Sequence, residues 1–404
     1  MRQVEVRLRF APDREFLVGR LAEAERRLYF EYDSAFVAGG LQISPFKLLL
    51  QVGAIEHRDR AFGPLPGVFD DSMPDGWGRL LMDRHFRQQG LDPRSISVLD
   101  RLLWLGTRSL GALSYHPAPE SAPAQALDLQ ALLGHATDVL SGEASEVLPQ
   151  LLRAGGSPGG ARPKVLVGLR GDEVLSGEDE LPTGFEHWLV KFAACQELAD
   201  AGPVEYAYAL MARAAGMEMP PVRLLALGEQ TRCFAVQRFD RLPGNRRLHL
   251  HSFANLLHAD FRVPSLDYAD LFRVTQALTR NHQDLLRAFR LMLFNIAAHN
   301  RDDHGKNVAF LMDDQGAWRL APAFDLTFSP GPGGEHSTTV AGEGRAPGLD
   351  QVQTLARQFG LRPRELDALR ESVNAAIELW AEFAEQAECR RSVTKEIAAR
   401  LQTV

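Results

Sequence analysis

The stretch HNRDDHGKNVAFLMDDQGAWRLAPAFDL, residues 299–326, is the most informative part of this chain. Two apolar runs, 307–312 and 317–326, flank the turn DDQG, and Asp and Gly suit a tight reversal, so the stretch predicts a polar loop followed by a β-hairpin. Folding the hairpin back would bring Asp325, at its end, beside Asn307, at its start. Magnesium prefers such oxygen ligands. The sequence therefore predicts a magnesium site at Asn307 and Asp325.

The polar loop before the hairpin contains a candidate for acid–base chemistry. Asp302 precedes Asn307 by five positions, the spacing of a protein-kinase catalytic loop, in which the aspartate accepts the proton of the substrate hydroxyl. This spacing alone is weak evidence, because it is expected about once by chance in a chain of this length. The order of loop, hairpin and second carboxylate is much rarer. Asp303 lacks the five-residue register to Asn307, so Asp302 is the predicted base.

The region before this loop contains groups suited to holding phosphate. A glycine-rich turn around residues 155–160 leads into the strand-like run VLVGL, 165–169, and the backbone amides before that run could cradle a phosphate. The run HWLVKF, 187–192, predicts a buried strand that contains Lys191. Burying a lysine among Leu, Val and Phe is costly unless an anion pairs with it. The simpler alternative is a strand-edge lysine whose ammonium group reaches solvent.

Two further segments follow in the order expected of a nucleotide-binding lobe. Glu205 opens the predicted helix 204–216, where a kinase carries the glutamate that pairs with the strand lysine. A glutamate in the first turn of a helix is also stabilised by the helix dipole alone, so that reading stays open. The run CFAVQRFDR, 233–241, is strand-like and then polar, as expected of a linker that reaches adenine.

With these residues in place, the chain from about residue 157 to 330 resembles the catalytic region of the HipA-type kinases, the toxins of bacterial toxin–antitoxin pairs. The resemblance rests on the following matches: a Ser-x-x-Gly-x-x-x-Lys loop at Ser157, Gly160 and Lys164, the strand lysine Lys191, R-F-D-R at 238–241, N-x-D-D-H-x-K-N at 300–307, and P-x-[FY]-D at 322–325. The motif PLPGVFDDSMPDGWGRLL, 64–81, extends the resemblance into the N-terminal third.

The resemblance implies an ATP- and Mg²⁺-dependent serine/threonine protein kinase and a role for each matching residue. Asp302 would be the catalytic base, and Asn307 and Asp325 would bind magnesium. The nucleotide contacts that it implies are Lys191 and Gly160 at the phosphates, His304 at the γ-phosphate, the Gln237 and Phe239 backbone at adenine, and Asp240 near the ribose. His304 could equally be a structural loop histidine. Ser157 would be an autophosphorylation site, and a phosphate there should switch the enzyme off, because it adds negative charge to the loop that holds ATP.

The expected fold is α+β, a bilobal protein-kinase-like fold with a β-rich N-terminal subdomain and a helical C-lobe. Residues 1–120 contain alternating strand-like runs, 121–246 would form the kinase N-lobe with glycine-rich loop, strand lysine and linker, and 247–404 the helical C-lobe with the catalytic loop. The segment 327–348 is rich in Gly, Pro and Thr, so we expect it to be mobile.

Composition limits the classes of protein to which the chain could belong. Hydrophobic residues make up 45% and charged residues 24% of the 404 positions, the balance of a folded globular protein. The net charge of −7 disfavours autonomous binding to DNA. The three cysteines form no C-x-x-C pair, and the sequence offers neither a signal peptide nor a long apolar run, so we expect a cytoplasmic protein without a membrane span.

The resemblance also implies partners. These are a HipB-like DNA-binding antitoxin, operator DNA reached mainly through that antitoxin, and a protein substrate, for which an aminoacyl-tRNA synthetase, first a glutamate-specific one, is the suggestion. Two other classes stay open. A small-molecule kinase of the aminoglycoside or choline type shares the loop spacing and the metal aspartate, but lacks the R-F-D-R segment and the long β-rich N-terminal unit. A catalytically silent binding module is disfavoured because none of the predicted catalytic and metal-binding residues is missing.

Overall fold

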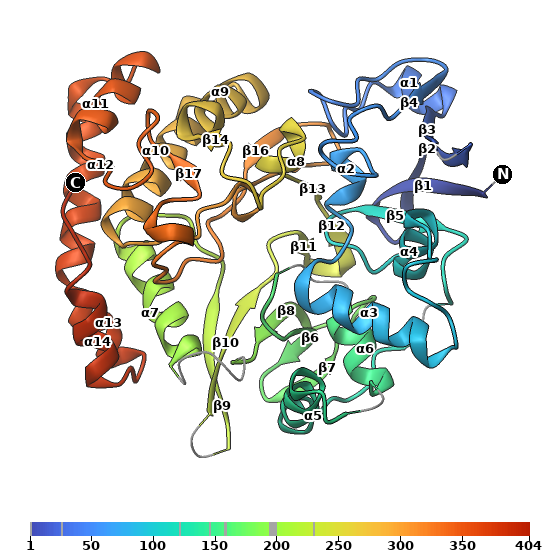
Figure 1. Cartoon of the computed structure of the whole chain (residues 1–404), viewed down its shortest axis with the longest axis horizontal. Coiled ribbons are helices and arrows are strands. Elements are labelled where there is room, and N and C mark those ends of the chain that lie inside the picture. Colours follow the sequence, from blue (N-terminus) through green and yellow to red (C-terminus); the bar gives the residue numbers. More distant parts are fainter. Residues whose placement is uncertain are drawn as a thin grey trace. The chain divides into compact units, whose positions relative to one another are not determined.

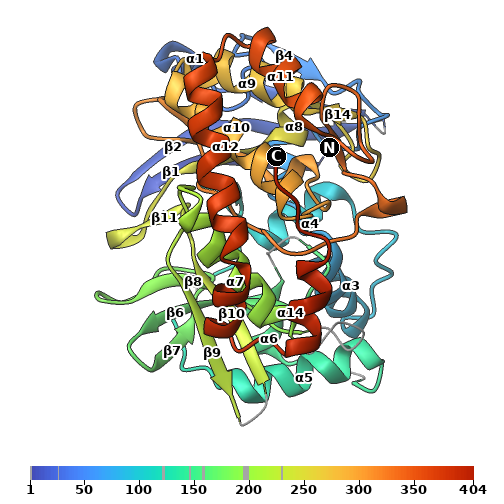
Figure 2. The same ribbon diagram turned by 90° about the vertical axis from the view of Figure 1, so that its left-hand side faces the viewer.

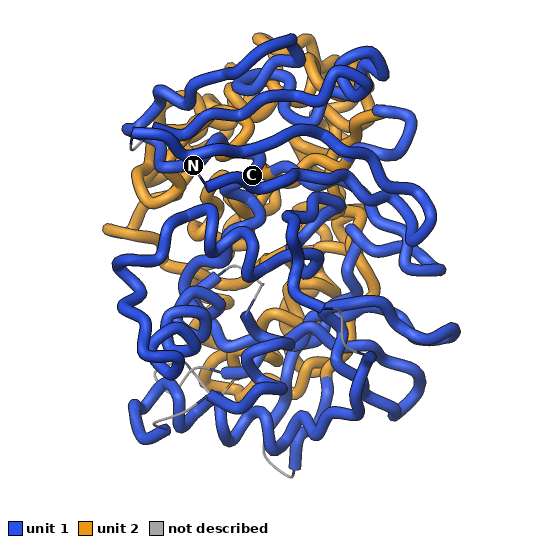
Figure 3. Tube along the Cα trace, turned by 90° about the vertical axis from the view of Figure 1, so that its right-hand side faces the viewer, with its two compact units in different colours: residues 1–199, 225–251, 312–316 blue, residues 200–224, 252–311, 317–404 orange. Residues whose placement is uncertain are grey.

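The computed structural model (Figures 1 and 2) describes residues 2–25, 27–120, 123–144, 147–156, 160–193, 200–228 and 231–404. The chain forms two compact units (Figure 3): unit 1 contains residues 1–199, 225–251 and 312–316, and unit 2 contains residues 200–224, 252–311 and 317–404. Unit 1 takes in most of the first two predicted subdomains. The division at residues 120 and 246 stays a prediction.

The N-terminal part of unit 1 is an antiparallel sheet with the strand order β4-β3-β2-β1-β5 (Figure 1). The strands are β1 (Arg2–Ala11), β2 (Arg14–Ala24), β3 (Arg27–Tyr32), β4 (Ala54–Glu56) and β5 (Leu113–His116), and the short helices α1 (Ser34–Gly39) and α2 (Gly67–Asp70) follow β3 and β4. Every second residue of β1 from Val4 to Phe10 is buried, as expected of a strand with one face in the core. Helix α4 (Val98–Leu105) packs against this sheet. The strand predicted at 4–10 is confirmed, and so is the described part, 27–32, of the strand predicted at 26–32.

A second sheet, whose strands belong to unit 1 apart from the first half of β9, carries the predicted phosphate-binding residues and has the strand order β7-β6-β8-β10-β9. Its strands are β6 (Lys164–Arg170), β7 (Glu173–Ser176), β8 (Glu186–Lys191), β9 (Val222–Leu227) and β10 (Thr231–Gln237). Three helices, α3 (Gly76–Gln88), α5 (Leu129–Ser141) and α6 (Pro149–Gly155), share one apolar core with β6, β8 and β10. Trp77 of α3 and Trp188 of β8 are among its largest members. The N-terminal motif 64–81 therefore leads into a helix that packs on this second sheet.

Unit 2 is mainly helical. Its helices are α7 (Ala201–Ala214), α8 (Phe253–Leu257), α9 (Tyr268–Thr279), α10 (His282–Ala297), α11 (Leu349–Gln358), α12 (Pro363–Glu378), α13 (Trp380–Gln386) and α14 (Arg391–Ala398). Helix α12 packs against α7 and α10, and Figure 2 shows it running alongside them. The rings of Phe272 on α9 and Phe289 on α10 stack with centroids 3.9 Å apart. A β-rich N-terminal region followed by a helical C-terminal part is as predicted.

The predicted β-hairpin after the polar loop is present, with β15 (Ala309–Met312) paired to β16 (Trp318–Leu320). The remaining strands are short: β11 (Arg241–Leu242), β12 (Arg246–Arg247), β13 (His249–Ser252), β14 (Leu266–Asp267) and β17 (Thr338–Thr339). Among the helices of the described residues, none combines the length and the apolar character that crossing a bilayer requires.

The segment 327–348, which we expect to be mobile, contains a short strand and long-range hydrogen bonds in its middle. Strand β17 of this segment pairs in parallel with β14. The Thr339 hydroxyl donates to Oδ2 of Asp267 at 2.6 Å, and the amide of Gly342 donates to the same oxygen at 2.8 Å. Asp267 lies 72 residues before Thr339, so local composition could not reveal this partner.

Asp240, near the end of the predicted linker, is buried among guanidinium groups in unit 1. Arg238 donates to both of its oxygens, at 2.9 and 2.7 Å, and Arg241 donates to Oδ2 at 2.7 Å. The amide of Gly111 also donates to Oδ2, at 2.8 Å. Burial alone would raise the pKa of Asp240, but the two guanidinium groups outweigh it and hold this pKa well below its ordinary value. Asp240 thus fastens the linker to the loop around Gly111.

We expect Asp240→Asn to lower the free energy of unfolding at pH 7 by about 3 kcal/mol, because two buried guanidinium groups lose their countercharge. The folded-state pKa of Asp240 lies below its unfolded value of about 3.9, so the stabilisation is complete above that pH and is lost as the pH falls below it. Urea unfolding between pH 7 and pH 3 measures both effects. The stability difference between wild type and variant should shrink toward pH 3, whereas Asp13→Asn, at an exposed turn, should change little. A difference that is constant with pH would contradict the expectation.

Candidate active site

Two buried lysines lie opposite each other in the second sheet of unit 1. Lys164 begins β6 and Lys191 ends β8, and the antiparallel register pairs them directly. Only 5% of Lys164 and 8% of Lys191 are exposed. Directly opposed residues lie on one face with Cβ atoms about 5 Å apart, and like charges in that position are destabilising. Two cationic side chains on one face are compatible with a ligand that carries several negative charges, which stays a prediction.

Gly160 precedes this lysine pair and has the backbone geometry of a tight turn. Its φ of +93° lies in the left-handed region that favours glycine. A Cβ added there would lie 2.4 Å from Nζ of Lys164, so the ammonium group folds back over the end of the turn. The structure thus brings together Gly160 and the lysine pair. Ser157 lies outside the described residues.

The predicted adenine linker continues from the neighbouring strand. Phe234 of β10 pairs directly with Lys191, whose Nζ lies 5.8 Å from the centroid of the Phe234 ring. Gln237 ends β10, opposite Trp188, and is half-buried, as is Phe239. The adenine contacts of these backbone groups stay a prediction.

The ribose contact expected of Asp240 also stays a prediction. Asp240 is 4% exposed, and four hydrogen bonds from protein donors already reach its carboxylate. A ribose hydroxyl would have to share these oxygens with the existing donors. What the structure shows for Asp240 is the anchoring of the linker.

In unit 2 the adjacent aspartates of the polar loop have opposite environments. The side chain of Asp302 is 55% exposed, whereas that of Asp303 is 1% exposed. Asp303 accepts hydrogen bonds from the Tyr268 hydroxyl at 2.9 Å and the Ser337 amide at 2.8 Å, and its Oδ2 lies 2.9 Å from Nδ1 of His336. Asp303 therefore holds the loop in place, and Asp302 is the aspartate that a substrate could reach.

The same network ties the loop to helix α10. Asn295, near the end of α10, donates through Nδ2 to the Tyr268 hydroxyl at 2.9 Å. Asn300 donates to Oδ1 of Asn295, also at 2.9 Å. The amide of Arg301 then donates to the carbonyl of Ser329 at 3.3 Å, so the loop runs beside the segment that follows Asp325. These contacts fix the loop from both sides.

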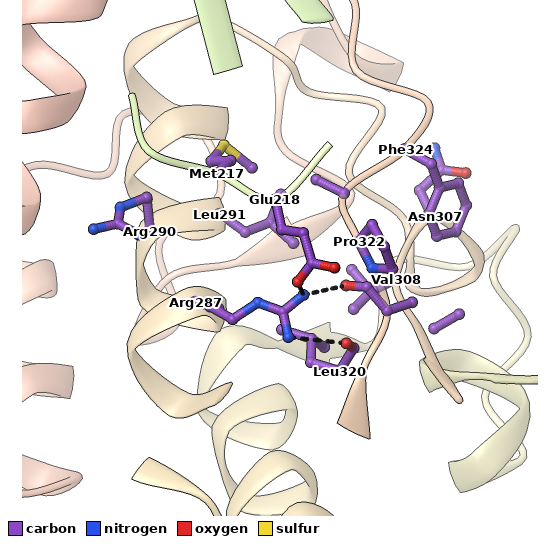
Figure 4. Close-up of a pocket in the computed structure, with 13 residues that line it drawn as sticks. Met217, Glu218, Arg287, Arg290, Leu291, Asn307, Val308, Leu320, Pro322 and Phe324 are labelled. Carbon is purple, nitrogen blue, oxygen red and sulfur yellow. Dashed lines mark hydrogen bonds and ion pairs between the residues drawn. The ribbon is translucent and has the colours of Figure 1, made fainter. Parts of the chain in front are cut away.

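Asn307 and Asp325 come from the two ends of the hairpin. Nδ2 of Asn307 donates to the Asp302 carbonyl at 2.8 Å, so its amide oxygen is the atom that a metal ion would take. Phe324, directly before Asp325, lines the same pocket as Asn307 (Figure 4). Asp325 has a φ of +57°, which is uncommon outside glycine and often marks functional positions.

The donor chemistry of this pair fits magnesium, because Mg²⁺ takes one or two protein oxygens and completes its shell with phosphate and water. The described residues contain no group of three or more His, Cys, Asp or Glu side chains placed to hold a metal by themselves. Magnesium binding by Asn307 and Asp325 stays a prediction.

His304 lies on the same loop as Asp302. Its Nε2 is 3.9 Å from Oδ1 of Asp302, and its ring packs on Phe261 with centroids 5.0 Å apart. Nδ1 of His304 is buried and makes no hydrogen bond within the described part of the chain. A phosphate contact and a structural role are both compatible with this placement.

Glu205 lies on α7 and is only 1% exposed. The helix begins at Ala201, and its first turn contains no acidic residue. The helix-dipole alternative for Glu205 is therefore wrong, since the dipole effect falls off beyond the first turn. Its pairing with Lys191 stays a prediction.

Lys164 is the site residue that the sequence indicated least clearly. It completes the Ser-x-x-Gly-x-x-x-Lys motif, but only the strand register shows that it faces Lys191. The available signal was its position at the start of VLVGL, a run whose residues are all buried.

Known proteins give an independent view of the chain. The family model HipA-like C-terminal domain matches residues 156–381, and the model HipA N-terminal domain matches residues 14–116. A protein of Sinorhizobium fredii (strain NBRC 101917 / NGR234) named "Putative kinase Y4mE" is 30% identical over 129 residues, which cover 29% of this chain and 30% of that protein. The chain thus aligns with less than a third of this relative's length.

Two solved structures are similar. HipA of Shewanella oneidensis MR-1, solved in complex with HipB and operator DNA, superposes with a TM-score of 0.69 at 16% identity, covering 98% of this chain and 96% of that one. The proinflammatory kinase CtkA of Helicobacter pylori covers 54% of this chain and 88% of its own, at 12% identity and a TM-score of 0.36, too low to support an argument. The first likeness confirms the predicted α+β fold.

The contrast between the two loop aspartates leads to a direct test of stability. We expect Asp303→Asn to lower the free energy of unfolding by about 3 kcal/mol, because the substitution replaces one acceptor oxygen with a donor inside a buried, fully used site. Asp302→Asn, the same substitution one residue earlier, should change it by less than about 0.5 kcal/mol. Urea denaturation monitored by tryptophan fluorescence measures both. Equal stabilities of the two variants would refute the assignment of Asp303 as the structural aspartate.

Proposed function

The chain belongs to the HipA family, and from this premise we propose that it is an ATP- and Mg²⁺-dependent serine/threonine protein kinase and the toxin of a toxin–antitoxin pair. The observation that carries the proposal is the opposed pair of buried lysines, Lys164 and Lys191. Gly160, which precedes Lys164 in the chain, has a positive φ. A polyanion such as a nucleoside triphosphate is the ligand that this face would favour.

The loop of unit 2 supplies the groups for phosphoryl transfer. Asp302 is exposed on a loop that Asp303 fixes, so it can accept the proton of a hydroxyl without moving. Asn307 and Asp325 would hold magnesium, which neutralises charge on the phosphates when bound. His304 would approach the γ-phosphate. Most of the catalysis would then come from positioning and charge, as is usual for this reaction.

The proposed partners follow from the family and from the similar structure. HipA of Shewanella oneidensis was solved with HipB and operator DNA, and we propose a HipB-like DNA-binding antitoxin for this chain. Its net charge of −7 favours contact with DNA mainly through such a partner. An aminoacyl-tRNA synthetase in the cytoplasm is the proposed substrate, and Ser157 the proposed autophosphorylation site.

The first test is incubation of the protein with ATP and magnesium, followed by intact-mass and peptide mass spectrometry. We expect one added phosphate on Ser157. Asp302→Ala should lower the rate of phosphoryl transfer by at least about 1,000-fold while the Kd for ATP stays within about twofold, because the base acts on the acceptor hydroxyl. Full activity of Asp302→Ala would sink the assignment. ATP binding without any phosphorylated protein would favour the small-molecule kinase, to be tested with aminoglycosides and choline.

The lysine pair gives a second test. We expect Lys164→Met and Lys191→Met each to raise the KM for ATP by about 30-fold, since each removes a charge-assisted contact to phosphate while retaining an apolar stem. Lys47→Met, at an exposed position, is the matched control and should leave KM unchanged. Steady-state kinetics with varied ATP gives the values. A normal KM in both site variants would mean that the face does not bind the nucleotide.

A further inference from the structure

The proposed function leaves the N-terminal motif 64–81 without a role. The motif ends in helix α3, and the residues at the start of α3 contact the end of the glycine-rich turn, all within unit 1. Both backbone groups of Gly160 are used in this contact. Its amide donates to Oδ1 of Asp75, and its carbonyl accepts from the amide of Trp77 at 3.0 Å.

Asp75 binds Gly160 through its carboxylate and does not cap its own helix. It occupies the N-cap position of α3, where an aspartate ordinarily accepts a hydrogen bond from an amide of its own helix. Here it forms no such bond, although Asp33 and Asp128 cap α1 and α5 in that way. Its carboxylate is directed to Gly160 instead, 85 residues later in the chain. The hydrogen-bonding capacity of this carboxylate is thus used to hold the backbone of Gly160 and not to cap α3.

Gly76 and Trp77 complete the contact. A Cβ on Gly76 would lie 2.5 Å from the Gly160 carbonyl oxygen and 2.7 Å from Cα of Ala161, so only glycine permits this approach. The indole Nε1 of Trp77 donates to the Lys164 carbonyl at 3.1 Å. A Cβ on Gly155, the last residue of α6, would lie 2.9 Å from the same Nε1. The indole nitrogen is thus close to both the end of α6 and the start of β6.

We propose that Asp75, Gly76 and Trp77 form a clamp that positions the end of the phosphate-binding turn, Gly160 to Lys164, for the nucleotide. Asp75 and Trp77 hold the backbone of Gly160. Trp77 also binds the carbonyl of Lys164, the first residue of β6, whose ammonium group would contact the nucleotide. They are positioning residues, because they act on ATP through the turn. The inference rests on the proposed function, since it names residues that determine how well the kinase holds ATP.

The direct test is hydrogen–deuterium exchange of the full chain, read by mass spectrometry on peptides that cover residues 160–164. In Asp75→Ala we expect exchange there to be about 10-fold faster than in wild type, because a charged acceptor is lost. Asp75→Asn keeps an acceptor oxygen at the same position and should restore exchange to within about threefold. Unchanged exchange in Asp75→Ala would overturn the clamp.

The second readout separates positioning from general stability. Trp77→Phe removes the bond to the Lys164 carbonyl, and the matched control Trp380→Phe removes an equivalent bond, at 3.0 Å, from a buried indole to the Thr394 carbonyl in unit 2. Both should lower the melting temperature to a similar extent. Only Trp77→Phe and Asp75→Ala should weaken ATP binding, by about fivefold and 10-fold in calorimetric Kd, with kcat at saturating ATP within about twofold of wild type.

The two proposals fail in different ways. If wild type binds ATP and the clamp variants bind it equally well, the clamp has no positioning role and the kinase proposal stands. If wild type binds no ATP, the kinase proposal fails and the nucleotide-positioning role fails with it. Loss of affinity in Trp380→Phe as large as in Trp77→Phe would also overturn the clamp, because general destabilisation would then explain the effect.

Discussion

The buried carboxylate of Asp303 is the constraint on which the candidate active site of unit 2 depends. It accepts from Tyr268 and Ser337 and contacts His336, groups contributed by helix α9 and by the segment after the hairpin. Leaving a buried charge without such partners would be costly, so the loop and the segment have to form together. The network fixes the backbone of the loop and leaves the neighbouring Asp302 exposed. A hydrogen-bonded loop with one exposed carboxylate is compatible with the proposed role of Asp302 as proton acceptor.

Unit 1 contains a different arrangement of buried charged side chains. Lys164 and Lys191 face each other in its second sheet, and both are almost fully buried. If this face binds a nucleotide as proposed, the positive charges are gathered during folding and not during binding. The contact between the start of α3 and Gly160 lies four residues before the first lysine, and under the clamp proposal it positions the same turn.

Much of the fold and of the site could be predicted from local patterns. The alternating run 4–10, the apolar run 187–192 and the hairpin around DDQG all became strands, because periodicity and turn chemistry are local properties. Segment 327–348 has a loop-like composition, yet its middle forms β17, which pairs with β14, more than 70 residues away. Glu205 was placed in the first turn of its helix, whereas the structure begins that helix at Ala201. Helix ends are set by weak local signals, so such shifts are common.

The sequence by itself determined the class of fold, the order of the segments proposed to bind phosphate and to act in catalysis, and the family, because these depend on residue types and on their spacing along the chain. Only the tertiary structure decided which of two adjacent aspartates is buried, that Lys164 faces Lys191, and that Asp75 binds Gly160 in place of its own helix. Each of these depends on groups far apart in the chain, and their meeting is fixed by strand register and packing. A one-dimensional pattern carries no information on such pairs until the chain has folded.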